Sequence, residues 1–198
     1  MIDPQTWVAQ TCTGLADLLA STGAADWDES SLCEGWAVRH VVAHVTMPVR
    51  LTPEQFGAEM AAARGDFTVL SNTVAARDAS LPVDDLLAQL RSSALHAWQP
   101  PGGGALGALT HAVVHSLDVT IALQRPTVVP DQAATTVLEQ LTASGGALFG
   151  VDLDGVRLEA SDTGWSWGRG RSFRADLGSL VALASGRTLP DGLALPRR

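Results

Sequence analysis

The 198-residue sequence predicts a mainly α-helical protein that ends in a small α+β segment. Up to residue 146, apolar residues recur at helical spacing in one segment after another. From residue 156 the spacing changes to the alternation typical of strands, and a last apolar segment again suits a helix. We therefore expect a helical domain at 1–146 and a hairpin–helix subdomain at 147–198.

Four segments in the first half of the chain suit helices. The first lies at 5–22, where apolar residues lie on one face. The second lies at 36–49, and Pro48 is expected to kink it or mark its end. A proline at the first position favours a helix start at 53–63, and 67–80 suits one more helix.

Three further helices are expected before the composition changes. Acidic residues in its first turn support a helix at 83–98. The most apolar segment, 105–124, is expected to be a buried helix that Pro126 stops. Asp131 can cap a helix that runs to about residue 144.

The C-terminal segment predicts one hairpin and one short helix. Val156, Leu158 and Ala160 alternate with charged residues, turn residues follow, and Trp165 and Trp167 alternate again. The GRGR stretch at 168–171 follows this hairpin, and residues 175–185 are expected to form a helix.

Composition excludes several classes of function. The chain has 21 acidic and 13 basic residues, a net charge of -8, which disfavours nucleic-acid binding. Its long apolar segment carries ionisable side chains, so we expect no membrane span. The start lacks the features of a secretory signal, which favours a cytoplasmic protein. Cys12 and Cys33 form no CxxC motif and are expected to be ordinary core or surface thiols.

Four of the five histidines form two HxxxH pairs, His40 with His44 and His111 with His115. A spacing of four puts both members of a pair on one helix face, and Asp118 continues the face of the second pair. Three imidazoles from two helices suit Zn²⁺, with Ni²⁺ as a further option. The alternative is that each histidine is a core residue whose ring is hydrogen-bonded within the protein.

Asp118 has three possible roles in this reasoning. It can be a fourth metal ligand, it can accept the remaining N–H of a metal-bound imidazole, or it can pair with an arginine. We favour the second role, because metal-bound histidines usually donate their other N–H to an oxygen. Trp36 can line a pocket or pack at the start of its helix.

Three segments carry a resemblance to a known family: EGWAVRHVVAHV, HAVVHSLDVTIAL and RLEASDTGWSWGRGRSFRADLGSLVALASGR. They resemble motifs of the mycothiol-dependent maleylpyruvate isomerase family, within the DinB-like superfamily. The resemblance implies a four-helix bundle with a divalent metal held by His44, His111 and His115. The isomerases usually have glutamate where His111 stands. The family often has aspartate where His40 stands, so His40 is not carried over as a ligand.

The resemblance implies an enzyme whose metal activates a low-molecular-weight thiol, such as mycothiol as co-substrate, for transfer to or isomerisation of an electrophile. Arg169, Arg171 and Arg174 can bind a carboxylate of that thiol or of the substrate, or they lie in a solvated turn. One alternative is a metal-dependent hydrolase with His40 or Asp118 as its base. Another is a non-catalytic metal-binding or stress-response protein. We expect small-molecule partners, with a homodimer as a further option.

Overall fold

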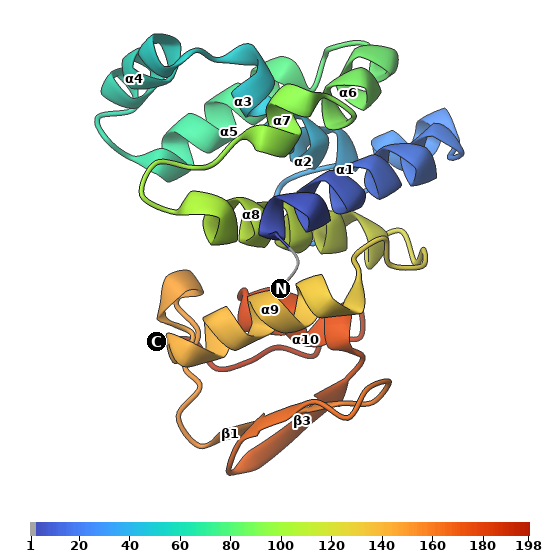
Figure 1. Cartoon of the computed structure of the whole chain (residues 1–198), viewed down its shortest axis with the longest axis vertical. Coiled ribbons are helices and arrows are strands. Elements are labelled where there is room, and N and C mark those ends of the chain that lie inside the picture. Colours follow the sequence, from blue (N-terminus) through green and yellow to red (C-terminus); the bar gives the residue numbers. More distant parts are fainter. Residues whose placement is uncertain (1–2) are drawn as a thin grey trace.

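The protein is described here by a computed structural model that covers residues 3–198. Its helices form layers, with a small sheet at one end of the molecule (Figure 1). The bundle helices are α1 (Pro4–Ala20), α2 (Val38–Val45), α3 (Met47–Arg50), α4 (Pro53–Ala62), α5 (Phe67–Asp78), α6 (Val83–Leu90), α7 (Ser93–Ala97) and α8 (Gly104–Thr120), with a 3₁₀ turn η1 (Ala24–Trp27). The remaining elements are α9 (Asp131–Ala143), η2 (Ala147–Phe149), β1 (Val156–Ala160), β2 (Ser166–Gly168), β3 (Arg171–Ala175) and α10 (Leu177–Ala184). The predicted mainly α fold is confirmed.

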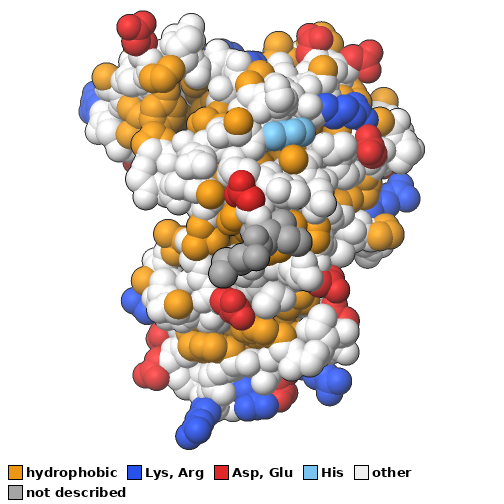
Figure 2. Space-filling view, in the orientation of Figure 1, with side chains coloured by type: hydrophobic (Ala, Val, Ile, Leu, Met, Phe, Trp, Pro, Cys, Tyr) orange, Lys and Arg blue, Asp and Glu red, His pale blue; other side chains and the backbone are white. Residues whose placement is uncertain are grey.

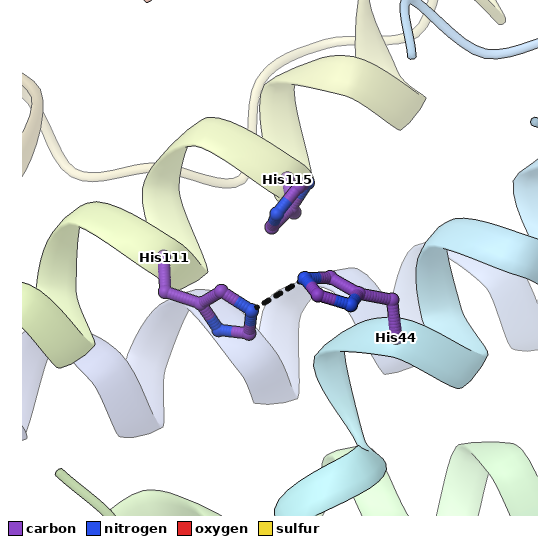
Figure 3. A group of neighbouring side chains, drawn as sticks. All are labelled: His44, His111 and His115. Atoms are coloured by element: carbon purple, nitrogen blue, oxygen red, sulfur yellow. Dashed lines mark hydrogen bonds between the residues drawn. The ribbon is translucent and has the colours of Figure 1, made fainter. Parts of the chain in front are cut away.

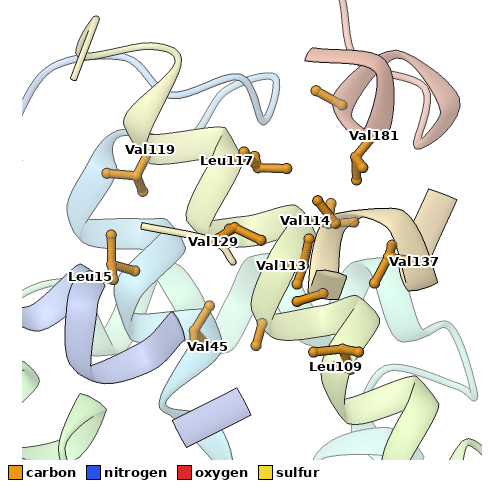
Figure 4. Packing of buried hydrophobic residues seen from close by; sticks show 14 of the residues in the cluster. Leu15, Val45, Leu109, Val113, Val114, Leu117, Val119, Val129, Val137 and Val181 are labelled. Atoms are coloured by element: carbon orange, nitrogen blue, oxygen red, sulfur yellow. The ribbon is translucent and has the colours of Figure 1, made fainter. Parts of the chain in front are cut away.

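Helix α8 is the centre of the packing. It contacts α1 and α2 on one side and α9 and α10 on the other. Figure 4 shows the contact, with Leu15 of α1 and Val45 of α2 on one side of Val113, and Val137 of α9 and Val181 of α10 on the other. The apolar faces predicted from sequence thus meet in one core. That core crosses residue 146, and the domain boundary placed there stays a prediction.

Two expected helices are broken in the structure. The segment at 83–98 divides into α6 and α7, because the Ser92 side chain caps a new helix by accepting from the amide of Ala94. The segment at 36–49 divides at Thr46 into α2 and α3, and Pro48 lies in the first turn of α3, where a proline is tolerated. The break after α2 leaves His44 in the last turn of its helix.

Smaller differences concern helix ends. Helix α8 ends at Thr120, well before Pro126, and the amide of Arg125 returns to the carbonyl of Thr120. Asp131 is the first residue of α9, and Pro130 stands at the N-cap position instead. The first position of the helix suits the acidic side chain of Asp131, since it lies at the positive end of the helix dipole.

The predicted hairpin is present, and a third strand joins it. β1 pairs with β2 antiparallel and with β3 parallel, so β1 is the central strand. The connection between β2 and β3 crosses the start of β1, where a Cβ on Gly170 would lie 2.0 Å from the carbonyl oxygen of Gly155. Glycine permits this close crossing, which the strand alternation alone did not reveal.

Helix α4 is attached more weakly than the others. None of its residues is buried, and it packs through half-buried Phe56 and Met60 against a small separate cluster formed by Met47, Leu70 and Val74. Figure 2 shows hydrophobic side chains gathered on the surface over this part of the molecule. Among the described helices, none has the length and apolar character needed to cross a membrane.

Candidate metal centre

His44, His111 and His115 come together between α2 and α8, and we call them the histidine triad. Figure 3 shows the three rings turned toward one another from the two helices. The Nε2 atoms of His44 and His111 lie 3.1 Å apart, and one ring nitrogen from each residue lies within 4.8 Å of the others. The juxtaposition predicted from the two HxxxH pairs is therefore present in the structure.

Burial keeps two members of the triad, His44 and His111, in the neutral form. Burial lowers the pKa of His44 well below its usual range, and the charges of His115, His111, Arg187 and Arg50 lower it further. Burial, together with the charge of His115, lowers the pKa of His111 to about 3. A neutral imidazole has a free lone pair, so both residues are in the form that can ligate a metal.

The spacing of the ring nitrogens fits a divalent ion. In a tetrahedral Zn²⁺ site with Zn–N bonds of about 2.0–2.1 Å, two ligand nitrogens are about 3.3–3.4 Å apart, close to the distance between the Nε2 atoms of His44 and His111. The other ring nitrogen of His44, Nδ1, is buried and has no hydrogen-bond partner among the described residues. An ion held through Nε2 would leave Nδ1 unpaired, so the fit rests on the Nε2 spacing.

Asp118 lies behind His115 rather than in the triad. Its Oδ2 atom accepts a hydrogen bond from Nδ1 of His115 at 2.9 Å, and the Arg187 guanidinium donates to both carboxylate oxygens at 2.7 and 2.9 Å. The Cys33 thiol also donates to Oδ2, at 3.0 Å. Asp118 thus fixes the ring of His115 through a hydrogen bond and also has an arginine partner, the contacts that two of its three possible roles require. Its part in metal binding or catalysis stays a prediction.

This carboxylate stays ionised although it is fully buried. Burial alone would raise the pKa of Asp118, but the hydrogen bonds from Arg187 and His115 outweigh burial and hold the pKa well below its usual range. Burial raises the pKa of the Cys33 thiol far above its usual range, and the Asp118 charge raises it further. Cys33 is therefore a thiol donor to Asp118 and not a nucleophile in this state.

A second buried ion pair supports the end of α2. Arg50 pairs with Asp78 at 2.8 Å, donates to the hydroxyl of Thr46 at 2.7 Å and also donates to the carbonyl of Ala43, the residue before His44. A cavity of about 480 Å³ lies beside this network, among α3, α4 and α5. The network fixes the last turn of α2, which positions His44.

Three aromatic rings edge the triad. Trp36 and Phe67 lie 5.1 and 6.4 Å from the His44 ring, and Trp98 lies 5.6 Å from the His111 ring, all between ring centroids. Trp36 also packs against the main core just before α2, so both interpretations given for it agree with its contacts. Phe67 and Trp98 were not singled out from the sequence. Phe67 begins α5 and Trp98 follows α7, and neither position indicates which residues of other helices the ring will contact.

The other predicted site residues lie elsewhere. Nδ1 of His40 accepts from the amide of Ala37 and so caps the start of α2, and its catalytic role stays a prediction. Arg169 lies in the turn before β3, and Arg171 and Arg174 are exposed on β3. The predicted turn is thus partly a strand, and thiol binding by these arginines stays a prediction.

Sequence reasoning missed Arg187 and Cys33. Arg187 belongs to the GR dipeptide that ends the third segment resembling the family, and this could have drawn attention to it. Nothing in the sequence spacing links Arg187 to Asp118. Cys33 lies 85 positions from Asp118 in the sequence. Only the tertiary fold, through the backbone contact of the Leu32 amide with the Asp118 carbonyl at 3.0 Å, brings that loop to α8.

The comparisons with known proteins agree with this architecture. Residues 8–102 match the family model of the mycothiol maleylpyruvate isomerase N-terminal domain, in agreement with the family that the sequence resembles. The crystal structure of the mycothiol-dependent maleylpyruvate isomerase is similar, with 17% identity and a TM-score of 0.56. A histidine-to-alanine mutant of that isomerase is 14% identical with a TM-score of 0.58.

Both similarities cover 98% of this chain and 95% of the other chain, and at these identities they establish a common fold. The comparison with curated proteins gives no match.

Proposed function

We propose that this protein is a metal-dependent enzyme that transfers or isomerises an electrophile with a low-molecular-weight thiol, mycothiol in the first instance. The observation that carries the proposal is the convergence of His44, His111 and His115, with Asp118 behind His115. Three protein ligands leave a coordination position free for another molecule, which is typical of catalytic Zn²⁺ sites, whereas structural sites use four protein ligands. The family of residues 8–102 supports the choice of thiol.

His44, His111 and His115 would hold the ion. When bound, Zn²⁺ would lower the pKa of a coordinated thiol, so that a thiolate is available near neutral pH. Because all three ligands are neutral, the ligand set itself leaves the charge of a divalent ion uncompensated, which favours an anionic fourth ligand. Asp118 and Arg187 keep the His115 ring in one orientation, and the Arg50 network keeps the end of α2 in place.

The hydrolase alternative has weaker support because it needs a general base. The depressed pKa of Asp118 and its ion pair with Arg187 make this carboxylate a poor proton acceptor near neutral pH. Nδ1 of His40 is occupied by the amide of Ala37. The two bases named for hydrolysis are therefore both engaged in structural hydrogen bonds.

The test compares thiol and water as nucleophiles. Protein purified without added metal is assayed for metal content, then for turnover of maleylpyruvate and of simple enones with mycothiol, with cysteine and without thiol. We expect about one ion per chain and turnover that requires mycothiol. Turnover that is equal without thiol would assign the protein to hydrolases, and full metal content in a His111→Ala variant would refute the site.

A further inference from the structure

We propose that the electrophile handled at the histidine triad carries an aromatic or other flat apolar group, which Trp36, Phe67 and Trp98 bind, instead of a carboxylate at that position. This inference rests on the proposed function and names its substrate class. It starts from the three rings that edge the triad at centroid distances of 5.1, 6.4 and 5.6 Å. We call Trp36, Phe67 and Trp98 the aromatic rim.

The rim presents apolar surface and has little polar capacity to spare. The indole N–H of Trp36 is already used, since it donates to Oδ1 of Asn72 at 2.9 Å. Trp36 and Trp98 are half-buried, while 51% of Phe67 is exposed. A flat apolar group that reaches His111 or His44 from solvent would contact these ring faces and edges, a favourable arrangement for aromatic pairs.

One member of the rim is also a large hydrophobic side chain that stays exposed. Among the described residues these side chains are Phe67, Val69 and Leu148, and only Phe67 lies beside the triad, since Val69 is two positions further along α5 and faces another side of that helix. Helix α5 could have carried a polar residue at position 67 without loss to its core, which uses Leu70 and Val74. Exposed apolar surface next to a polar cluster is typical of a ligand site.

The cations near the triad are not free to bind a carboxylate. The arginines whose charge acts on His44 are Arg187 and Arg50. Arg187 is paired with Asp118, and Arg50 with Asp78, and both carboxylates are buried. A substrate carboxylate at the rim would gain an arginine partner only by breaking one of these pairs, which is costly, whereas an apolar group there needs no counter-charge. In the proposed function the charge of a bound divalent ion is taken by the thiolate, so it does not serve a carboxylate at the rim.

The reaction expected of such a substrate is thiol addition to an enone. The sulfur forms a bond to the β-carbon, the π-bond of the alkene breaks, and the thiol proton ends on the α-carbon, so that atoms and electrons balance. The aromatic group on the β-carbon would then lie against the rim while the reacting carbon faces the triad.

A matched pair of substrates tests this. Benzylideneacetone and acetylacrylate are both enones with a methyl ketone, and they differ in a phenyl or a carboxylate on the β-carbon. With mycothiol, and with each rate divided by the uncatalysed rate, we expect kcat/KM to favour benzylideneacetone at least tenfold. Phe67→Ala should lower that preference about fivefold, the order of one aromatic contact, and Leu148→Ala should leave it unchanged.

A binding experiment separates this inference from the proposed function. Benzylacetone and levulinate are the unreactive saturated counterparts, and their binding is followed through the indole N–H signals of the six tryptophans. We expect benzylacetone to shift the signals of Trp36 and Trp98 alone, and to bind the Phe67→Ala variant more weakly. Levulinate should shift neither signal. If benzylacetone binds but no thiol-dependent turnover is found, the proposed function is refuted, while the aromatic rim remains a binding site for a flat apolar group.

Three results would overturn the inference. The first is that levulinate binds as tightly as benzylacetone, or that kcat/KM for acetylacrylate equals kcat/KM for benzylideneacetone. The second is a Phe67→Ala variant with unchanged preference and unchanged benzylacetone binding. The third is a shift of the same indole signals with protein concentration, since a second copy of the chain would then cover the rim.

Discussion

Replacing Arg187 with methionine is expected to destabilise the protein strongly while preserving much of the side-chain volume. The guanidinium donates to both oxygens of Asp118, whose side chain is fully buried, and only 17% of the Arg187 side chain is exposed. Removing one partner of a buried ion pair leaves an uncompensated charge and typically costs about 3–5 kcal/mol. For a protein of this length that loss lowers Tm by about 6–20 °C.

The matched control is an exposed ion pair. Arg91 and Asp17 lie 2.8 Å apart, with 40% and 66% of their side chains exposed. Exposed pairs of this kind contribute about 0–1 kcal/mol, so Arg91→Met should change stability little. Urea unfolding followed by circular dichroism measures both free energies of unfolding.

A third variant identifies the cause of the loss. Adding Asp118→Asn to Arg187→Met removes the uncompensated charge, so the double variant should be more stable than the Arg187→Met single variant. Metal affinity should also fall about 10–100-fold in Arg187→Met, because the His115 ring loses its fixed acceptor. The reasoning is refuted if Arg187→Met unfolds at the same urea concentration as Arg91→Met.

Three further predictions follow from the same structure. Replacing any member of the histidine triad by alanine should abolish stoichiometric metal binding, measured by elemental analysis, whereas His96→Ala, whose ring contacts a backbone carbonyl on α6, should retain it. Both thiols should react slowly with a thiol reagent until the chain is unfolded, because burial raises the pKa of Cys12 to about 12 and that of Cys33 further, and fast labelling of folded protein would contradict this. Lastly, stability should fall as pH drops below about 6.5, since the depressed pKa values of His44 and His111 mean that the unfolded chain binds more protons than the folded one there. Thermal unfolding between about pH 8 and pH 5 measures this loss, with and without chelator, and flat curves in both samples would exclude neutral buried histidines.

The sequence predicts the helices and the triad because both depend on local periodicity. A spacing of four residues fixes the relative direction of two side chains on one helix, so His111 and His115 could be placed together without any tertiary information. The approach of a histidine from a second helix required that α2 and α8 pack together, as they do. The choice of His44 rather than His40 came from the family resemblance and not from the spacing, which is the same for both members of the pair.

The features that sequence could not provide all depend on long-range contacts. β3 is a strand because residues at 171–175 lie beside β1, and the central place of β1 follows from a glycine crossing that no alternation pattern encodes. At Ser92 the chain can either continue the helix or let the serine side chain cap a new one. The helix propensities of the neighbouring residues do not decide between the two.

The contact between Arg187 and Asp118 explains why a segment outside the family match can matter to the candidate metal centre. The match ends at residue 102, whereas two triad members and Asp118 lie on α8 and Arg187 follows α10. Because the carboxylate that orients His115 is itself held by an arginine from the C-terminal segment, folding of that segment and orientation of the ligand are energetically linked. Loss of stability and loss of metal affinity in Arg187→Met should therefore occur together, while changes at the exposed arginines of β3 should affect neither.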